Sequence, residues 1–211
     1  HKRIGDKDTG LNTGGMGTIA PNPYYTKEIA KECFDKIFIP TISAMNKEGR
    51  TFKGCLYFGL MITKDGAKVI EYNCRFGDPE TQVILPLLKS DLLDIMIATT
   101  NGNLDKVKVE FENKSAACII MASEGYPLEY KKGFAINIPK DIIERVYFAG
   151  VKKENEKLLT NGGRVLGITN IADTLDKAIK LSYEDAKQIS FEGAYYRKDI
   201  GEKALLKKGN N

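Results

Sequence analysis

The sequence predicts an α+β protein, with an antiparallel hairpin and helices in its first half and a small β-rich unit with one helix in its second half. Two strand-length apolar runs, 54–63 and 67–75, are joined by Lys64-Asp65-Gly66, and Asp-Gly between such runs is the strongest short-range hairpin signal. After about residue 104 the chain returns to short strand-like runs separated by Gly, Pro and Asn. We therefore predict two domains, 1–103 and 104–211.

Composition and charge are those of an ordinary globular protein. The 211 residues are 42% hydrophobic and 28% charged, and the net charge of +4 is spread along the chain, so neither nucleic acid nor a membrane is an expected partner. No apolar run approaches the roughly 20 residues that span a bilayer. The four cysteines lie far apart without a CxxC pair. We expect reduced thiols, mostly in the core, in a cytoplasmic protein.

The first half of the chain divides into a loop, a helix, the hairpin and a second helical region. Residues 1–23 are dense in glycine and proline, which predicts an ordered loop and not a helix. Apolar spacing predicts a helix over 26–46, with Pro40 kinking or dividing it. After the hairpin, Asp78-Pro79-Glu80 has the order of a helix N-cap, a first-turn proline and an acid, and predicts a helix through residue 88.

The remaining elements alternate between helices and strands. A helix is predicted from Ser90-Asp91 to Gly102. The predicted strands are 107–111, 116–121, 146–149 and 164–170. A last helix is expected over 174–189 with Asp173 as its cap. Its apolar stripe comprises Leu175, Ala178, Ile179, Ser182, Ala186 and Ile189. The closing residues 207–211 are predicted to fray.

Polar residues share one face of the second hairpin strand. Side chains alternate along a strand, so Glu71, Asn73 and Arg75 project to one side. A carboxylate and an amide oxygen at this spacing suit Mg²⁺ that bridges phosphates, and the arginine suits an anion. The alternative is the solvated face of a hairpin, and the spacing leaves both open. Cys74 has the opposite parity, which predicts a core residue. The helix start that follows at Asp78 would favour an anion, with capping as the main role of Asp78.

The segment 5–17, GDKDTGLNTGGMG, is a second candidate for chemistry. It lacks the ending of a Walker A loop and is not a dinucleotide fingerprint. Clustered glycines let a backbone approach a ligand closely, so a ligand-covering loop is one interpretation. A merely flexible loop is the other.

Several strings, in this order, resemble one known family. They are HKR at 1–3, GDKDTGLNTGGMG at 5–17, EYNCRFGDPETQ at 71–82, ASEGYP at 122–127, NGGRVLG at 161–167, FEG at 191–193 and YRKDIG at 196–201. Together they resemble the phosphoribosylamine glycine ligase family, also called glycinamide ribonucleotide synthetase, across nearly the whole chain.

The resemblance implies the second half of an ATP-grasp domain, an antiparallel sheet with helices, followed by a small β-rich C-terminal domain with a helix. It implies a purine-biosynthesis enzyme that joins glycine to 5-phosphoribosylamine, converting ATP to ADP and phosphate through glycyl phosphate. ATP and Mg²⁺ or Mn²⁺ are the implied cofactors.

The resemblance also carries site residues. Glu71 and Asn73 match the family's metal-binding pair, and Arg75 and Asp78 are the expected catalytic residues. The residues expected to bind substrate or phosphate are Lys2, Arg3, Asp8, Thr13, Gly14, Gly15, Gly17, Gly77 and Arg164.

One departure from the family concerns the front of the enzyme. A whole ligase carries further residues that grip ATP before the position of His1, and the chain, which opens on histidine, is expected to be a fragment whose partner is that N-terminal portion. The chain alone is expected neither to bind ATP tightly nor to ligate glycine. Two rivals remain: another ATP-grasp carboxylate-amine ligase or carboxylase half, and a non-catalytic binding module.

Overall fold

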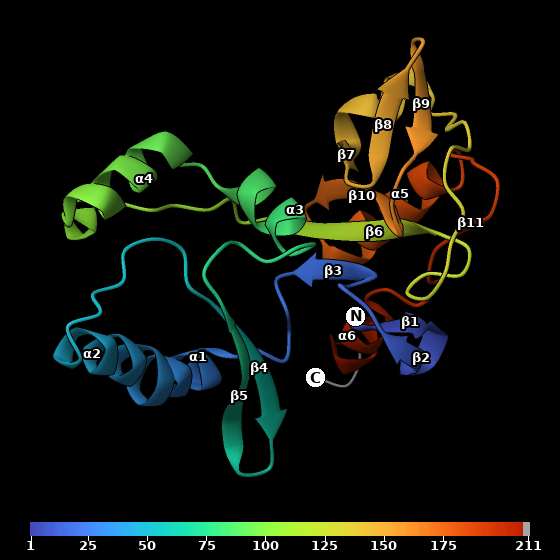
Figure 1. Ribbon diagram of the computed structural model, residues 1–211. Helices are drawn as coiled ribbons and strands as arrows, with labels where there is room; N and C mark the ends of the chain where they lie inside the picture. The colour runs from blue at the N-terminus through green and yellow to red at the C-terminus, as the bar shows by residue number, and fades with distance from the viewer. Residues whose placement is uncertain (209–211) are drawn as a thin grey trace. The chain divides into compact units, whose positions relative to one another are not determined.

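The computed structural model describes residues 1–208, which form two compact units (Figure 1). Unit 1 comprises His1–Pro21, Asp78–Leu87 and Asn113–Asn211, of which 209–211 lie outside the described residues. Unit 2 comprises Asn22–Gly77 and Leu88–Glu112. The division at residue 103 stays a prediction.

Unit 1 is built on a five-stranded antiparallel sheet in the order β11-β6-β10-β7, with β3 also paired to β6. The strands are β3 (Gly17–Ala20), β6 (Ser115–Ser123), β7 (Val146–Phe148), β10 (Arg164–Ala172) and β11 (Ala194–Tyr195). Every residue of β6 is buried, because both of its faces are covered. Ala116, Cys118 and Ile120 pack with Val83 and Leu87. The odd-numbered residues face the main cores.

Helix α5 (Leu175–Ala186) covers the other face of the sheet and contacts β6 and β10. The predicted stripe is confirmed, since Leu175, Ala178, Ile179, Ser182 and Ala186 are all buried. The predicted cap is wrong. Thr174 has extended backbone angles, and its hydroxyl accepts from the Lys177 N–H. Ile189 is buried but follows the end of the helix.

The smaller elements of unit 1 include strands that the sequence did not reveal. Inside the predicted loop 1–23, β1 (Arg3–Gly5) pairs with β2 (Thr9–Asn12) across a 3-10 turn at Asp6–Asp8. A hairpin is formed by β8 (Val151–Glu154) and β9 (Lys157–Thr160). Two further helical elements of unit 1 are the 3-10 helix η5 (Lys140–Arg145) and helix α6 (Glu202–Lys208). Residues 207 and 208 of the predicted frayed tail end α6, and the rest lies outside the described residues.

The segment after the hairpin differs from the predicted helix. Helix α3 (Thr81–Ile84) begins two residues later than expected and continues as a 3-10 helix (Leu85–Leu87). Its N-cap is Glu80, which makes no side-chain cap bond. Asp78 cannot serve as the cap because its carboxylate is bonded to Arg164 and Gln82.

Unit 2 contains the predicted long helix, the hairpin and a further helix. Helices α1 (Lys27–Cys33) and α2 (Ile39–Lys47) run together through a π-helical turn (Phe34–Phe38). The π turn ends two residues before Pro40, which has no N–H for the regular hydrogen-bond ladder of the helix. The predicted hairpin is confirmed as β4 (Tyr57–Thr63) and β5 (Gly66–Asn73). Helix α4 (Leu92–Asn101) follows, capped by Asp91 and ended by left-handed Gly102.

One predicted strand of unit 2 is absent. A 3-10 turn (Leu104–Lys106) precedes residues 107–111, where Phe111 makes an isolated bridge to Leu88 and the Lys89 N–H bonds to Glu110. This stretch is therefore extended backbone without a full strand ladder. The α+β class with antiparallel sheets is confirmed. Within residues 1–208, no helix has both the length and the apolar content that crossing a bilayer requires.

Candidate functional site

The predicted metal pair lies at the end of strand β5 in unit 2. Glu71 is opposite Gly59 and Asn73 is opposite Tyr57. A register shift leaves Ile70 without a partner, so the regular alternation is broken just before Glu71. No shift lies between Glu71 and Asn73, and their side chains therefore project to the same face of the hairpin.

The surroundings of this pair are polar and accessible. Glu71 is exposed and Asn73 half-buried. A Cβ at Gly59 would lie 2.8 Å from Glu71 Cγ, so the glutamate side chain lies across the glycine. Arg75 turns back toward the strand: its Nη2 donates to Asn73 Oδ1 at 3.2 Å and its Nη1 to the Phe76 carbonyl at 2.8 Å.

These donors fit a hard divalent cation. A carboxylate and an amide oxygen are ligands that Mg²⁺ prefers, and the Asn73 oxygen has a second lone pair besides the one facing Arg75. Within residues 1–208, no three His, Cys, Asp or Glu side chains gather into a metal site. A cation here would need further oxygens from a ligand such as a phosphate.

Cys74 is not a core residue. Its side chain is exposed, although its parity predicted burial. Strand β5 ends at Asn73, so alternation no longer fixes the direction of the next side chain.

In unit 1, residues 13–17 form a turn that is hydrogen-bonded to other segments of the chain. The Thr13 hydroxyl donates to the Lys2 carbonyl at 2.7 Å and accepts from the Gly15 N–H at 2.9 Å. The Gly14 N–H donates to the Tyr126 hydroxyl at 3.0 Å. The amide groups of Gly14 and Gly15 are thus already engaged, and a phosphate would have to displace these partners.

The glycines of this turn are explained by close contacts. Gly15 has φ +119°, and a Cβ there would lie 2.6 Å from Pro79 Cδ. Gly17 has φ +155°, and a Cβ would lie 2.8 Å from the Cys118 carbonyl oxygen. Any larger residue would therefore strain the backbone and collide with its neighbour.

Arg164 joins the turn to Asp78. Its Nη1 donates to the carbonyls of Gly14 at 3.0 Å, Gly15 at 3.4 Å and Asp78 at 3.0 Å. Its Nη2 pairs with Asp78 Oδ2 at 3.1 Å. Four of the predicted site residues, Gly14, Gly15, Asp78 and Arg164, therefore form one cluster within unit 1.

Two other predicted residues, Arg3 and Asp8, belong to a separate cluster around Arg197. The Arg3 carbonyl accepts from Arg197 Nη1 at 3.0 Å, while the Arg3 guanidinium donates to the Gly10 carbonyl at 2.7 Å. Asp8 pairs with Arg197 at 2.9 Å and also with Lys203. Arg197 is 1% exposed and pairs with Asp199 as well. The hydrogen bond from Lys203, with those from Arg197, holds the pKa of Asp8 below its usual value.

Arg197 was not predicted as an important residue. The sequence offered one signal, the place of Arg197 in the YRKDIG string. Its burial could not be expected, because arginine is seldom fully buried unless it is paired. Burial alone would raise the pKa of Asp199, but bonds from Arg197 and the Lys7 N–H outweigh it and lower the pKa to about 2. The cluster holds Asp6–Asp8, where Lys7 and Asp8 have positive φ.

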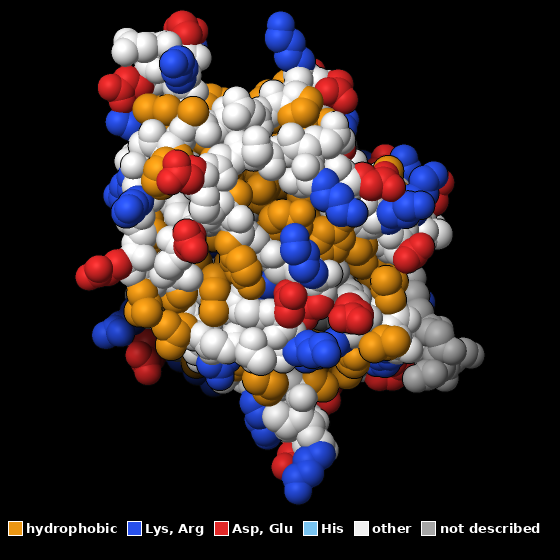
Figure 2. Space-filling model, turned by 90° about the vertical axis from the view of Figure 1, so that its right-hand side faces the viewer, with side chains coloured by type: hydrophobic (Ala, Val, Ile, Leu, Met, Phe, Trp, Pro, Cys, Tyr) orange, Lys and Arg blue, Asp and Glu red, His pale blue; other side chains and the backbone are white. Residues whose placement is uncertain are grey.

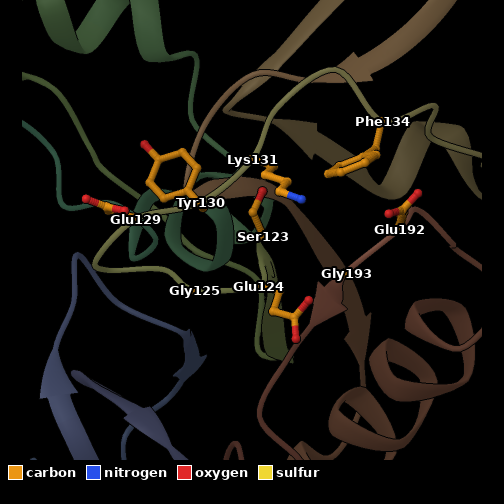
Figure 3. Close-up of a pocket in the computed structure, with 9 residues that line it drawn as sticks. All are labelled: Ser123, Glu124, Gly125, Glu129, Tyr130, Lys131, Phe134, Glu192 and Gly193. Carbon is orange, nitrogen blue, oxygen red and sulfur yellow. The ribbon is translucent and has the colours of Figure 1, made fainter.

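A hollow of about 460 Å³ opens elsewhere in unit 1 (Figure 3). The residues that line it are Ser123, Glu124, Gly125, Glu129, Tyr130, Lys131, Phe134, Glu192 and Gly193. None of the predicted site residues is among them. Figure 2 shows basic and acidic side chains interspersed over one face of the molecule, without a broad field of one sign.

Comparison with known proteins places the chain among ATP-grasp proteins. A solved biotin carboxylase domain of a thermophilic 2-oxoglutarate carboxylase superposes with a TM-score of 0.56 at 16% identity, over 86% of this chain and 41% of that one, which shows likeness of fold alone. The crystal structure of a phosphoribosylamine–glycine ligase from Thermotoga maritima superposes with a TM-score of 0.81 at 38% identity, over 94% of this chain and 49% of that one.

Sequence comparison gives the family. The description "Phosphoribosylglycinamide synthetase, ATP-grasp (A) domain" matches residues 1–81, and "Phosphoribosylglycinamide synthetase, C domain" matches residues 116–203. The chain belongs to the phosphoribosylglycinamide synthetase family. It is 52% identical to the phosphoribosylamine–glycine ligase of Caldanaerobacter subterraneus over 95% of its length. It is 49% identical to that of Fusobacterium nucleatum, again over 95%. The chain spans about half the length of these relatives, 48% in each case.

Proposed function

We propose that the chain is the carboxyl-terminal part of an ATP-dependent ligase that joins glycine to 5-phosphoribosylamine in purine biosynthesis, in the cytoplasm. The observation that carries the proposal is the identity of about half of all positions to ligases of that name across 95% of the chain. In the complete enzyme, the terminal phosphoryl group of ATP passes to a glycine carboxylate oxygen and ADP leaves. The amine then attacks the glycyl carbonyl, phosphate leaves and the nitrogen loses a proton.

Glu71 and Asn73 are the proposed ligands of Mg²⁺ or Mn²⁺. Their shared face and hard oxygens support this role. When bound, the cation would neutralise charge on the phosphates of ATP. Arg75 lies beside Asn73 and offers a guanidinium to an anionic group of the substrates. Because no covalent nucleophile is required, the contribution of these residues is positioning and electrostatic stabilisation.

The proposed partner is the remaining half of the same enzyme. Unit 2 exposes large apolar side chains on its hairpin and helices. They are Phe34, Ile39, Met61, Ile62, Ile70, Tyr72, Leu93, Met96 and Ile97. Exposed apolar side chains in this number are typical of surfaces that another part of a protein covers. We therefore expect only the complete enzyme to bind and convert ATP, glycine and 5-phosphoribosylamine. The chain alone is expected to show no turnover.

The proposal is tested by substitution in the complete ligase. Glu71→Ala should lower kcat/KM by about 100-fold or more, because a metal ligand for the phosphates is lost. Glu112→Ala in the same unit removes an exposed carboxylate and serves as the matched control. Rates are measured as ADP formed over a range of Mg²⁺ concentrations. Equal activity of the two variants would remove Glu71 from the metal site.

A substrate comparison separates the ligase from its rivals. Wild-type complete enzyme should form ADP only when glycine and 5-phosphoribosylamine are both present. ADP formation that requires bicarbonate instead would indicate a carboxylase. No turnover with any acceptor would indicate a binding module.

A further inference from the structure

Tyr126, to which the family resemblance gave no role, contacts the glycine turn directly. Its hydroxyl oxygen accepts the Gly14 N–H at 3.0 Å. Its ring lies against Gly163, where a Cβ would approach Tyr126 Cδ2 to 2.1 Å. The glycine at position 163 is therefore required for the tyrosine ring to occupy this place.

The neighbouring residues of the NGGRVLG string hold the same arrangement. The Gly163 carbonyl accepts from the Ser123 N–H at 2.8 Å, and the Gly162 carbonyl accepts from the Ser123 hydroxyl at 2.9 Å. These bonds join the end of β6 to the start of β10. Strand β6 precedes Tyr126, and strand β10 begins with Arg164. Tyr126 therefore follows a strand end that is hydrogen-bonded to the segment containing Gly163 and Arg164.

A continuous set of contacts leads from Tyr126 to Asp78. The Tyr126 hydroxyl holds Gly14, the Gly14 carbonyl accepts from Arg164, and Arg164 pairs with the Asp78 carboxylate. The guanidinium has four acceptors, and all of them come from the chain itself. Arg164 therefore holds the glycine turn and Asp78 together, and its expected binding of a substrate phosphate stays a prediction.

We propose that Tyr126 is a positioning residue of the ligase, acting through Gly14 and Arg164 on Asp78. The inference rests on the proposed function, and on the family resemblance, which implies that Asp78 is a catalytic residue of that ligase. A group held only loosely at this position lowers the rate of the chemical step.

The test is Tyr126→Phe in the complete ligase, which keeps the ring on Gly163 and removes only the hydroxyl. Loss of this bond should lower kcat about 5- to 10-fold. The KM values for ATP, glycine and 5-phosphoribosylamine should stay within about twofold, because the hydroxyl is not proposed to touch them. The thermal midpoint should change by no more than about 2 °C. Tyr147→Phe, on a half-exposed tyrosine of β7, is the matched control.

A second variant keeps the proposal falsifiable if Tyr126→Phe is poorly folded. Arg164→Lys retains the charge but lacks the planar fork with which the guanidinium reaches its four acceptors. It should lower kcat with the same unchanged KM values. Both residues act through Gly14, so their effects should not multiply. The kcat of the double variant should lie within about twofold of the kcat of the slower single variant.

Three results would overturn the inference. They are a wild-type kcat in Tyr126→Phe, a loss of rate that only follows a lowered thermal midpoint, and strictly multiplicative effects in the double variant. Wild-type enzyme without glycine-dependent turnover would instead contradict the proposed function itself. Amide exchange at Gly14 gives an independent readout and should be about 10-fold faster in Tyr126→Phe.

Discussion

The two units of the chain bury apolar side chains very differently. In unit 1, strand β6 is buried from end to end, and its two faces pack against different clusters. In unit 2, the buried apolar side chains among the described residues are Cys33 and Ala98. The hairpin of unit 2 contacts the π-helical turn through aromatic rings: Phe58 meets the tilted ring of Phe38 and the edge-on ring of Tyr72. Tyr72 is nevertheless 52% exposed.

This difference separates stability from the proposed chemistry. Unit 1 has the dense core that a domain needs to fold by itself. Unit 2 carries the proposed metal pair and has little core of its own within the described residues. We infer that unit 1 supplies most of the free energy of unfolding of the chain, and that unit 2 depends on the rest of the enzyme.

The largest effect should come from truncating matched isoleucines on the two sheets. Ile168 on β10 is fully buried, whereas Ile70 on β5 is 61% exposed. Ile168→Ala should lower the free energy of unfolding by about 2–5 kcal/mol, because it leaves a cavity. Ile70→Ala should change it by less than about 0.5 kcal/mol. Urea denaturation followed by circular dichroism measures both, and equal losses would contradict the difference between the units.

The next effect concerns charge pairs. Arg197 is 1% exposed and pairs with Asp8 and Asp199. Arg197→Met should cost about 3 kcal/mol, because two carboxylates lose their buried partner. Lys31→Met breaks a pair with Asp35 in which both side chains are exposed, and should cost less than about 1 kcal/mol. The same denaturation experiment compares them. An unchanged free energy of unfolding in Arg197→Met would show that the cluster is dispensable for stability.

A smaller effect should appear on acidification. The pKa of Asp199 is about 2 in the folded protein, below the unfolded value of about 3.9. A lowered folded pKa stabilises the protein above the unfolded pKa, and this contribution is lost as pH falls toward the folded one. Between pH 5 and pH 3 the pairing should lose about 1 kcal/mol of stability. Asp199→Asn should flatten the dependence of the urea midpoint on pH, and an unchanged slope would exclude Asp199 as its source.

Much of the fold could be predicted because the signals were local. The Asp65-Gly66 turn, the Asp91 cap with Gly102 and the stripe of α5 each depend on a few neighbouring residues. The errors occurred where distant contacts decide. Asp78-Pro79-Glu80 resembled a helix start, but the Asp78 carboxylate is bonded to Arg164, far away in sequence. Strands β1 and β2 were hidden because residues 1–23 lack an apolar alternation.

The candidate site could be predicted only in part for the same reason. The shared face of Glu71 and Asn73 follows from strand periodicity. The hydrogen bonds of the Gly14 and Gly15 amides to Tyr126 and Thr13 could not be predicted from a local pattern. Tyr126, the partner of Gly14, lies 112 positions away in the sequence. Glycine density indicated close approach of the backbone. It did not show that the approaching groups are Arg164 and Pro79.

Chemical labelling of thiols tests the difference in burial between the two units without a substitution. Cys74 of unit 2 is exposed, whereas Cys118 on β6 is fully buried. Burial raises the pKa of the Cys118 thiol to about 12, so at neutral pH fewer than about one molecule in ten thousand holds the reactive thiolate. Maleimide should therefore label Cys74 rapidly and Cys118 only after denaturation, as peptide mass spectrometry would show. Equal labelling of both in the folded chain would mean that β6 opens as readily as the hairpin, and the proposed difference in stability between the units would fail.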